Sequence, residues 1–231
     1  MAFELDHLFI FTSVGAAAAQ QLASVGLTEG TPNTHPGQGS ACRRFFFRNV
    51  YLELLWLHDQ REAQSEATRR TCFWERWSGR TTGACPFGLI FRPSAPEAET
   101  PPFASWQYRP AYLPEGLSFR VGNNASHLSE PFLCALPFGR RPDEFPEARR
   151  EPLEHAPGLR EVTRVELSGP WTNFDLEWNA ESAVQTTQSK PGRLSVGLQR
   201  SPEYQAELGF DGETRGQQAD LRPALPLILR W

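Results

Sequence analysis

Two ionisable residues interrupt stretches of the sequence that are otherwise apolar. His7 lies within FELDHLFIFT, and Glu53 lies within VYLELLWL. Burying a carboxylate without a partner is costly, so Glu53 needs a cation, a hydrogen-bond donor or a metal ion beside it. An imidazole and a carboxylate together suit a divalent ion such as Zn, Ni, Fe or Mn, which can polarise two adjacent oxygens of a substrate. His7 and Glu53 are therefore the candidate catalytic and metal-binding residues.

Other interpretations of these two residues are open at this point. A lone histidine on an apolar strand is often a hydrogen-bonded core residue, and Glu53 could be neutralised by Arg43 or Arg44. Glu53 could also pair with His7 without a metal and orient the imidazole as a general base. Because side chains alternate along a strand, two sets of residues should share a face: His7 with Leu5, Phe9 and Phe11, and Glu53 with Tyr51, Leu55 and Leu57.

The segment HPGQG at residues 35–39 has a structural and a functional interpretation. Gly37 and Gly39 permit positive φ angles and Pro36 fixes the chain, so the segment can be a plain turn. The rim of a small-molecule pocket would also lie at such a turn, with His35 and Gln38 as polar contacts. A phosphate loop is excluded, because no Lys followed by Ser or Thr stands in the required places.

Around these residues the sequence predicts short strands joined by turns. Twenty prolines and 12% aromatic residues favour this arrangement over a helical bundle. Helical patterns occur at residues 13–26 and 170–184, and the charged segment 59–82 also fits a helix. Strand patterns occur at residues 3–12, 42–48, 50–57, 85–93, 115–121, 130–138, 161–169, 192–200, 204–212 and 225–231.

Charge and cysteine content exclude several classes of function. A net charge of -4 and a pI near 5.8 argue against nucleic acid as a partner, since phosphate binding needs a clustered basic face. No apolar stretch has the length of a membrane span, and Glu4 and Asp6 stand where a signal peptide would be basic. Without CxxC spacing we expect reduced thiols and a cytoplasmic location for the four cysteines, Cys42, Cys72, Cys85 and Cys134.

Three stretches, LDHLFIF, HPGQGSACRRFFFRNVYLELLWL and SEPFLCALPF, resemble the glyoxalase-like branch of the vicinal oxygen chelate (glyoxalase/bleomycin resistance/dioxygenase) superfamily. The resemblance implies an α+β fold in which repeated βαβββ modules form curved mixed β-sheets, with helices on the convex side and the active site on the concave side. Metal-dependent members of the superfamily take a histidine from the first strand of a module and a glutamate from its last strand. His7 and Glu53 match these two positions.

The second half of the family's ligand set has no match. Laying PFGLIF over DHLFIF puts Phe87 where a second histidine would stand, and PFLCALPF offers Leu133 or Cys134 in place of a second glutamate. The last module offers Glu166 but no histidine. Catalytic metals usually have three protein ligands, so the incomplete set favours a protein without a metal. The residues left to complete the set are His35, His127 and Glu130.

The repeated pattern predicts how the chain is divided. We expect a first module at residues 1–58, a linker at 59–82, a degraded middle segment at 83–140 and a final module-like segment at 160–231, together forming one composite globular unit. An odd number of modules would leave apolar strands exposed, which a two-fold homodimer could cover. If the middle and final segments interleave, the protein is a self-contained monomer, and this is the outcome we favour.

Fold does not determine function, so two classes of function are open. The first is a lyase or isomerase, either metal-assisted or histidine-based, and the second is a metal-free protein that binds or sequesters a small ligand. Both place a small molecule in a concave pocket floored by His7 and Glu53, with neither nucleic acid nor membrane as a partner. The expected substrate-binding residues are His35, Gln38, Arg43, Phe45, Phe47, Tyr51, His127 and Glu130.

Overall fold

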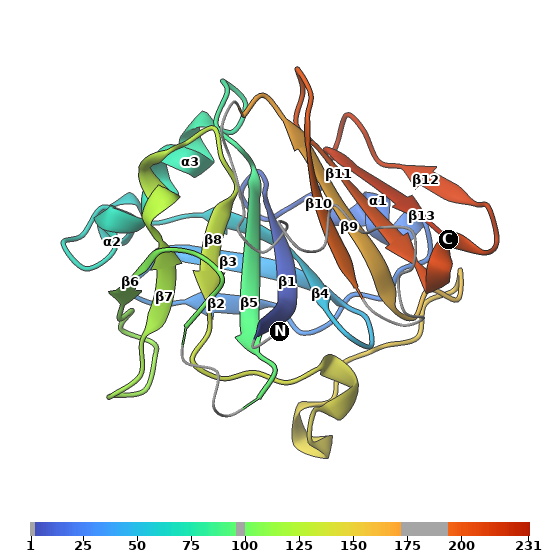
Figure 1. Cartoon of the computed structure of the whole chain (residues 1–231), viewed down its shortest axis with the longest axis horizontal. Coiled ribbons are helices and arrows are strands. Elements are labelled where there is room, and N and C mark those ends of the chain that lie inside the picture. The colour runs from blue at the N-terminus through green and yellow to red at the C-terminus, as the bar shows by residue number, and fades with distance from the viewer. Residues whose placement is uncertain (1–2, 96–99, 172–193) are drawn as a thin grey trace.

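The computed structural model describes residues 3–95, 100–171 and 194–231, and the chain has an α+β fold with two mixed β-sheets (Figure 1). The large sheet contains, in spatial order, β2 (Asn33–His35), β3 (Ser40–Phe46), β4 (Tyr51–Leu57), β1 (Phe3–Phe11), β5 (Phe87–Pro93), β8 (Phe132–Ala135), β7 (Phe119–Gly122) and β6 (Ser105–Tyr108). The small sheet contains β10 (Ser195–Arg200), β9 (Val162–Gly169), β11 (Gln205–Phe210), β13 (Leu227–Arg230) and β12 (Gln218–Asp220).

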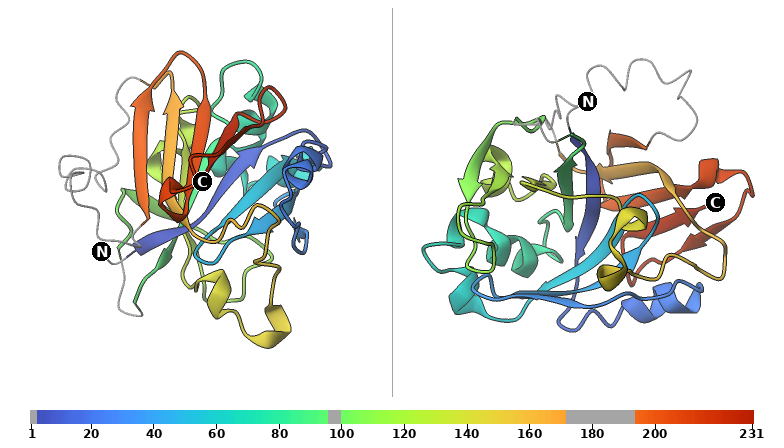
Figure 2. Two further views of the ribbon diagram at one scale, coloured as in Figure 1. Left: turned by 90° about the vertical axis from the view of Figure 1, so that its right-hand side faces the viewer. Right: turned by 90° about the horizontal axis from the view of Figure 1, so that it is seen from below.

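The helices are short (Figures 1 and 2). The helix expected at residues 13–26 is only α1 (Ala19–Ser24), because Gly15 and Ala16 adopt positive φ angles and form turns before it. The segment 59–82 contains α2 (Gln60–Ala63) and α3 (Phe73–Gly79). The predicted helix at 170–184 falls mostly outside the described residues. No helix in the described ranges has both the length and the apolar character needed to cross a membrane.

The large sheet has an approximate two-fold repeat. Strand β4 runs parallel to β1 in one half, and β8 runs parallel to β5 in the other half. The two halves meet where β1 and β5 pair antiparallel. The middle strands of the chain therefore extend the sheet of the first module. Strand β6 was not predicted, because the proline-rich segment before it resembles a loop.

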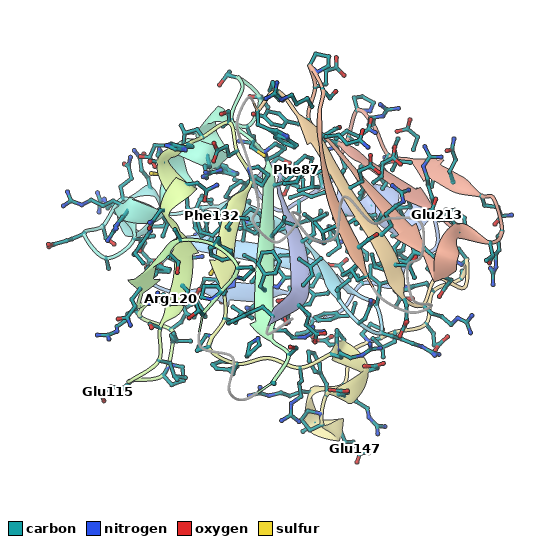
Figure 3. All side chains as sticks on the ribbon, in the orientation of Figure 1. Phe87, Glu115, Arg120, Phe132, Glu147 and Glu213 are labelled. Atoms are coloured by element: carbon teal, nitrogen blue, oxygen red, sulfur yellow. The ribbon has the colours of Figure 1, made fainter. Side chains whose placement is uncertain are left out.

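The small sheet repeats the central part of this arrangement. Its order β10-β9-β11-β13-β12 has the same parallel and antiparallel relations as β4-β1-β5-β8-β7 in the large sheet. One face of each sheet is apolar, and the two faces share a core that includes Leu8, Ile10, Leu54, Val165, Leu208 and Leu227. Figure 3 shows Phe87 of β5 beside this core and Phe132 of β8 on the other side of the large sheet.

The two sheets are also joined by an asparagine. Asn49 lies in the turn between β3 and β4, and its side-chain Nδ2 donates to the carbonyl of Val162 at 2.7 Å. Its Oδ1 accepts from the Val162 amide at 3.0 Å, so the side chain pairs like a strand neighbour with the start of β9. This pairing satisfies buried backbone groups where a turn meets a sheet edge.

Strand β1 contains an irregularity that determines which residues face the second side of the large sheet. The register with β5 shifts between Leu5 and His7, which is the signature of a β-bulge. Leu5 therefore packs in the core between the sheets, whereas Phe9 and Phe11 pack in the cluster on the opposite face. The expectation that Leu5 shares a face with His7 is wrong, because simple alternation ignores the bulge.

Candidate active site

A cavity of about 430 Å³ opens on the face of the large sheet that is turned away from the small sheet. His7 and Phe9 of β1 and Tyr51, Glu53 and Leu55 of β4 form one wall. The other half of the sheet supplies apolar side chains, and the loop after β6 covers one side. These further lining residues include Ile90, Phe119, Val121, Phe132, Cys134, Tyr108, Tyr112, Leu113 and Pro114. The cavity is thus largely apolar and aromatic, with a few polar groups at one end, as in most small-molecule sites.

His7 is held between two carboxylates. Its Nδ1 lies 2.7 Å from Oδ1 of Asp6, and its Nε2 lies 3.3 Å from Oε2 of Glu53. All three side chains are buried. The bulge in β1 lets consecutive residues Asp6 and His7 meet on the same side of the strand, which a regular strand does not allow. Tyr51 stacks on the imidazole with a centroid distance of 4.2 Å and fixes the plane of the ring.

Both members of the His7–Glu53 pair are held in their charged forms. Burial opposes the imidazolium, but hydrogen bonds to Asp6 and Glu53 and the charges of both carboxylates raise the pKa of His7 to about 8. Burial also opposes the Glu53 carboxylate, but the hydrogen bond and charge of His7 lower the pKa of Glu53 to about 2. At neutral pH, His7 is therefore an imidazolium and a proton donor.

The charge of Asp6 is balanced from the other side. Arg92 of β5 is 2% exposed, and its Nη1 lies 3.3 Å from Oδ2 of Asp6. The same guanidinium contacts Glu4 at 2.8 Å and donates to the Asn49 carbonyl at 2.8 Å. Positive and negative side chains thus alternate in the series of contacts from Arg92 through Asp6 and His7 to Glu53. Each buried charge has an opposite charge beside it, which lowers the cost of burying all four. Arg44 stands opposite Glu53 in the sheet but forms its ion pair elsewhere.

The turn at residues 35–39 forms a polar rim of the cavity. Gly37 and Gly39 have φ angles of 79° and 70°, and their amides donate to Oε2 of Glu62 at 2.7 and 2.9 Å. A side chain at Gly39 would meet a backbone oxygen at 2.2 Å, so this position requires glycine. The pinned turn presents His35 and Gln38 to the cavity, where sequence reasoning expected polar contacts.

Gln38 connects the two sides of the cavity through hydrogen bonds. Its Nε2 donates to Oγ of Ser40 at 2.8 Å. Its Oε1 accepts from the hydroxyl of Tyr108, at the end of β6, at 3.1 Å. The same oxygen accepts from the hydroxyl of Tyr112, in the loop after β6, at 3.2 Å. Burial raises the pKa of Tyr108 to about 12 and that of Tyr112 well above its usual value, so both stay neutral donors.

Three potential metal ligands come close together beside His7. One ligand atom each of His35, Cys42 and Glu53 lies within 4.8 Å of the others. Burial lowers the pKa of His35 and favours the neutral imidazole that a metal ion requires. Its ring nitrogens contact Asn33 at 3.2 Å and Ser40 at 2.9 Å, so a metal would have to displace one of these partners. The contact between Nδ1 of His7 and Asp6 also resembles the carboxylate–histidine pairs that orient metal ligands. Burial raises the pKa of Cys42, however, so its thiol needs a metal beside it to ionise.

The pairing of β1 with β5 identifies the residues that correspond to this site in the other half of the sheet. His7 stands opposite Ile90, and Phe9 stands opposite Gly88. Leu8 stands opposite Leu89, and a two-fold axis between these two residues relates His7 to Gly88 and Phe9 to Ile90. Sequence alignment had put Phe87 in that place, but Phe87 packs in the core between the sheets. The alignment was wrong by one residue, and such a shift moves a side chain to the other face of a strand.

The counterpart of Glu53 follows in the same way. In the parallel pair of β1 and β4, Glu53 stands beside Phe9, and in the parallel pair of β5 and β8, Cys134 stands beside Ile90. Cys134 therefore takes the place of a second glutamate, whereas Leu133 lies in the core between the sheets. Burial raises the pKa of the Cys134 thiol, so it remains neutral. Gly88 and Cys134 add no charged group, and the second half of the sheet does not complete the family's ligand set.

Three of the predicted substrate-binding residues lie on the wrong face of β3 or beyond its end. Phe45 and Phe47 are fully buried in the core between the sheets. Arg43 forms an ion pair with Glu29 and donates to a backbone carbonyl of Ala16, away from the cavity. The residues of β3 that stand opposite Leu55, Glu53 and Tyr51 are Cys42, Arg44 and Phe46. Assigning the alternating pattern one residue out of step explains the error.

His127 and Glu130 also lie outside the cavity. They form an ion pair with each other at 3.4 Å in the loop before β8, and the His127 side chain is exposed. The loop is organised by Arg76, which is fully buried and donates to four backbone carbonyls. These acceptors belong to Asn124, Ala125, His127 and Glu130. Glu166 belongs to the small sheet and pairs with Arg164 at 2.8 Å.

Several residues that belong to the site or contact it were not predicted from the sequence. Asp6 could have been noticed, since DH within an apolar run places a carboxylate next to the candidate histidine. Cys42 of β3 stands opposite Leu55 and has its sulfur within 4.8 Å of a ligand atom of Glu53, so alternation along β3 would have selected it. Tyr108 and Tyr112 come from a proline-rich region whose sequence pattern carries no such signal, because its position depends on pairing between β6 and β7.

Comparison with known proteins identifies the family of the chain and does not identify its activity. A search of curated proteins found no match. Among solved structures, a hypothetical protein from Staphylococcus aureus aligns with a TM-score of 0.49 and 10% identity, covering 99% of both chains. A hypothetical protein from Bacillus halodurans C-125 aligns with a TM-score of 0.40 and 14% identity, covering 61% of this chain and 98% of that one. The family model described as a glyoxalase-like domain matches residues 5–170. The chain belongs to the glyoxalase-like domain family.

Proposed function

We propose that the protein binds a small organic molecule in the 430 Å³ cavity and acts on it by proton transfer from His7, as a lyase or isomerase would. The observation that carries this proposal is the imidazolium held between Asp6 at 2.7 Å and Glu53 at 3.3 Å, with His7 and Glu53 lining the cavity. A proton donor with a pKa near 8 is suited to general acid catalysis at neutral pH.

We assign a distinct role to each residue of the cluster from its contacts. Asp6 accepts from Nδ1 and fixes the orientation of His7, and Tyr51 stacks on the ring. Nε2 lies beside Glu53 and both residues line the cavity, so a substrate oxygen that approaches there would take the proton from Nε2. Glu53 then faces a neutral imidazole and can accept a proton back from the substrate. The apolar walls exclude water and strengthen these electrostatic interactions.

A screen followed by matched variants tests this proposal. Thermal-shift screening of small hydroxy- and oxo-compounds should find stabilising ligands, and NMR of each ligand should show turnover that falls at least ~100-fold in His7→Gln. The control is His127→Gln, which replaces an exposed histidine outside the cavity. Turnover that is unchanged in His7→Gln, with the control also unchanged, would sink the acid–base role. Ligand binding without turnover would assign the protein to the binding class.

A second candidate is a metal-assisted reaction, favoured by the cluster of His35, Cys42 and Glu53. With His7 these residues could hold a divalent ion, which would supply Lewis-acid chemistry at a substrate oxygen. Metal analysis after purification with added Zn, Ni, Fe or Mn tests this candidate. Near-stoichiometric metal in the wild type that is lost in both His35→Gln and Glu53→Gln supports it. Metal content that is negligible in all three proteins contradicts it.

A further inference from the structure

A second cavity adjoins the candidate active site and is rich in arginine. It has a volume of about 750 Å³ and shares Tyr51, Leu136, Phe138 and Arg149 with the first cavity. Four arginines line it: Arg44, Arg140, Arg149 and Arg150. We call it the arginine chamber. Its outer wall comes from residues 136–151, a segment with two short 3₁₀ turns, η3 (Pro142–Glu144) and η4 (Glu147–Arg149), at the lower edge of Figure 1.

The positive charge of the chamber is not neutralised by its own acidic residues. Two carboxylates line it, and both are engaged: Asp6 with His7 and Arg92, and Glu151 with the Thr31 amide and Arg44. Within the part of the chain that the structure describes, the side chains of Arg140, Arg149 and Arg150 form no hydrogen bond or ion pair. Figure 3 shows Glu147 at the outer end of the same segment, pointing into solvent.

The chamber also has a surface suited to an organic ligand. Phe46, Phe145 and Phe138 line it, and Phe138 is 52% exposed at the boundary between the two cavities. Arg44 lies over the Phe46 ring at 5.0 Å and is held by the Thr31 carbonyl at 2.8 Å, so this guanidinium is fixed in place. Guanidinium groups bind carboxylate and phosphate oxygens in bidentate pairs.

We infer that the ligand of this protein is an organic anion that spans both cavities. Its acidic group, a carboxylate or a phosphate, lies among the arginines of the chamber, and its apolar body extends past Phe138 toward His7. This inference rests on the proposed function, because it uses the same cavity and names the class of substrate. It also explains why a chain with an overall negative charge gathers four arginines at one end of an apolar site.

Three probes with one aromatic body separate the charge from the shape. Naphthalene-2-carboxylate, its uncharged amide and 2-naphthyl phosphate are titrated by calorimetry into the full-length protein at low and at moderate salt. The acid should bind roughly tenfold more tightly than the amide, and this preference should shrink as salt rises. Tighter binding of the phosphate than of the carboxylate would identify the acidic group as a phosphate, and the reverse order as a carboxylate.

The variants assign the preference to the chamber. The double variant Arg140→Gln/Arg149→Gln should lose the preference for the acid while still binding the amide. The matched control is Arg61→Gln/Arg200→Gln, which removes the same charge at two exposed arginines that line neither cavity. Equal binding of acid and amide by the wild type, or a preference that survives in the chamber variant, overturns the inference and leaves the cavity's binding role intact. If no probe binds at millimolar concentration, the inference is overturned, and the screen of hydroxy- and oxo-compounds with His7→Gln decides the proposed function separately.

Discussion

The two halves of the large sheet share a strand arrangement and differ in chemistry. Strands β1 and β4 carry His7 and Glu53, whereas the related positions in β5 and β8 hold Gly88 and Cys134. The space beside Gly88 is filled by the ring of Phe9, which would lie 2.1 Å from a Cβ at that position. One half therefore supplies the charged groups and the other supplies an apolar wall, and the symmetry of the fold does not extend to the site.

The small sheet has the same strand arrangement, but its face opposite the core carries partly exposed charged side chains. Its face opposite the core carries Arg164 between Glu166, Glu207 and Glu213, at distances of 2.8, 3.3 and 2.7 Å. These side chains are partly exposed, and ion pairs of this kind contribute little to stability. The comparison suggests that burial, and not the presence of charge, distinguishes the His7 cluster from an ordinary charged sheet surface.

Removing one charge of the His7–Glu53 pair should give the largest loss in the free energy of unfolding. Glu53→Ala leaves the imidazolium with a single carboxylate, and we expect a loss of ~3 kcal/mol in the free energy of unfolding. Cys134→Ala, at the related position, removes a neutral atom and should cost ~1 kcal/mol. Urea denaturation of both variants at pH 7 measures the difference. Equal losses at the two positions would mean that the halves do not differ as described.

A side chain at Gly88 should be nearly as costly, because it enters a packed aromatic group. The Phe9 ring is enclosed by Phe11, Phe73 and Phe132, so it cannot move aside freely. Gly88→Ala should therefore lower the free energy of unfolding by ~2–3 kcal/mol. The matched control is Gly197→Ala in β10, where the nearest atom to an added Cβ is 3.8 Å away. Thermal unfolding of the two variants should show a clear shift only for Gly88→Ala.

The charged pair predicts a defined pH dependence of stability. The pKa of His7 is raised from 6.5 to about 8, so its contribution is complete below pH 6.5 and is lost as the pH rises through about 8. The pKa of Glu53 is lowered from 4.5 to about 2, so its contribution is present above pH 4.5 and is lost as the pH falls through about 2. Stability from this pair is therefore greatest between pH 4.5 and 6.5.

Urea denaturation between pH 6 and pH 9 measures the upper limb of this dependence. The wild type should lose ~2 kcal/mol over that range from His7. His7→Gln has no group that titrates at this position and should show a flatter curve. His127→Gln removes an exposed histidine and should keep the wild-type slope. A wild-type curve that stays flat up to pH 9 would contradict the charged state assigned to His7.

The smallest expected loss of stability comes from a substitution in the apolar half of the cavity. Tyr108→Phe removes one of two hydroxyls that donate to Gln38, and Tyr112 keeps the other contact. We expect a cost of ~1 kcal/mol or less and an unchanged titration of His7 by NMR. A large shift in the His7 titration would show that the second half of the sheet contributes to the electrostatics of the site after all.

Sequence patterns were sufficient for the parts of the fold that depend on local chemistry. The strands that became β1, β3, β4, β5 and β8 are predicted by their apolar runs, and the glycines of the 35–39 segment predict its turn. His7, Glu53, His35, Gln38 and Tyr51 were named from residue type and family resemblance, and all five line one cavity. A buried charge in an apolar strand is a strong signal because it needs a partner.

What sequence patterns missed depends on register and long-range pairing. The bulge before His7 decides that Asp6 contacts the imidazole, and alternation alone cannot place such a bulge. A shift of one residue along β3 moved Arg43 and Phe45 to the wrong face. The segment with the arginine pairs 140–141 and 149–150 has mixed charges and prolines, and its sequence carries no sign of a site, because its place beside β4 is fixed only by tertiary packing.

The core between the sheets has a consequence for how the chain folds. The apolar face behind the His7 strand is covered by residues of β9, β11 and β13, which follow it by more than 150 positions. Val196 of β10 and Leu227 and Leu229 of β13 are buried in that core. During synthesis the large sheet therefore has an uncovered apolar face until the last strands emerge from the ribosome, and contacts of such sequence separation form slowly. A fragment ending at residue 140 should accordingly be recovered as aggregate, even though it contains every residue of the His7 cluster.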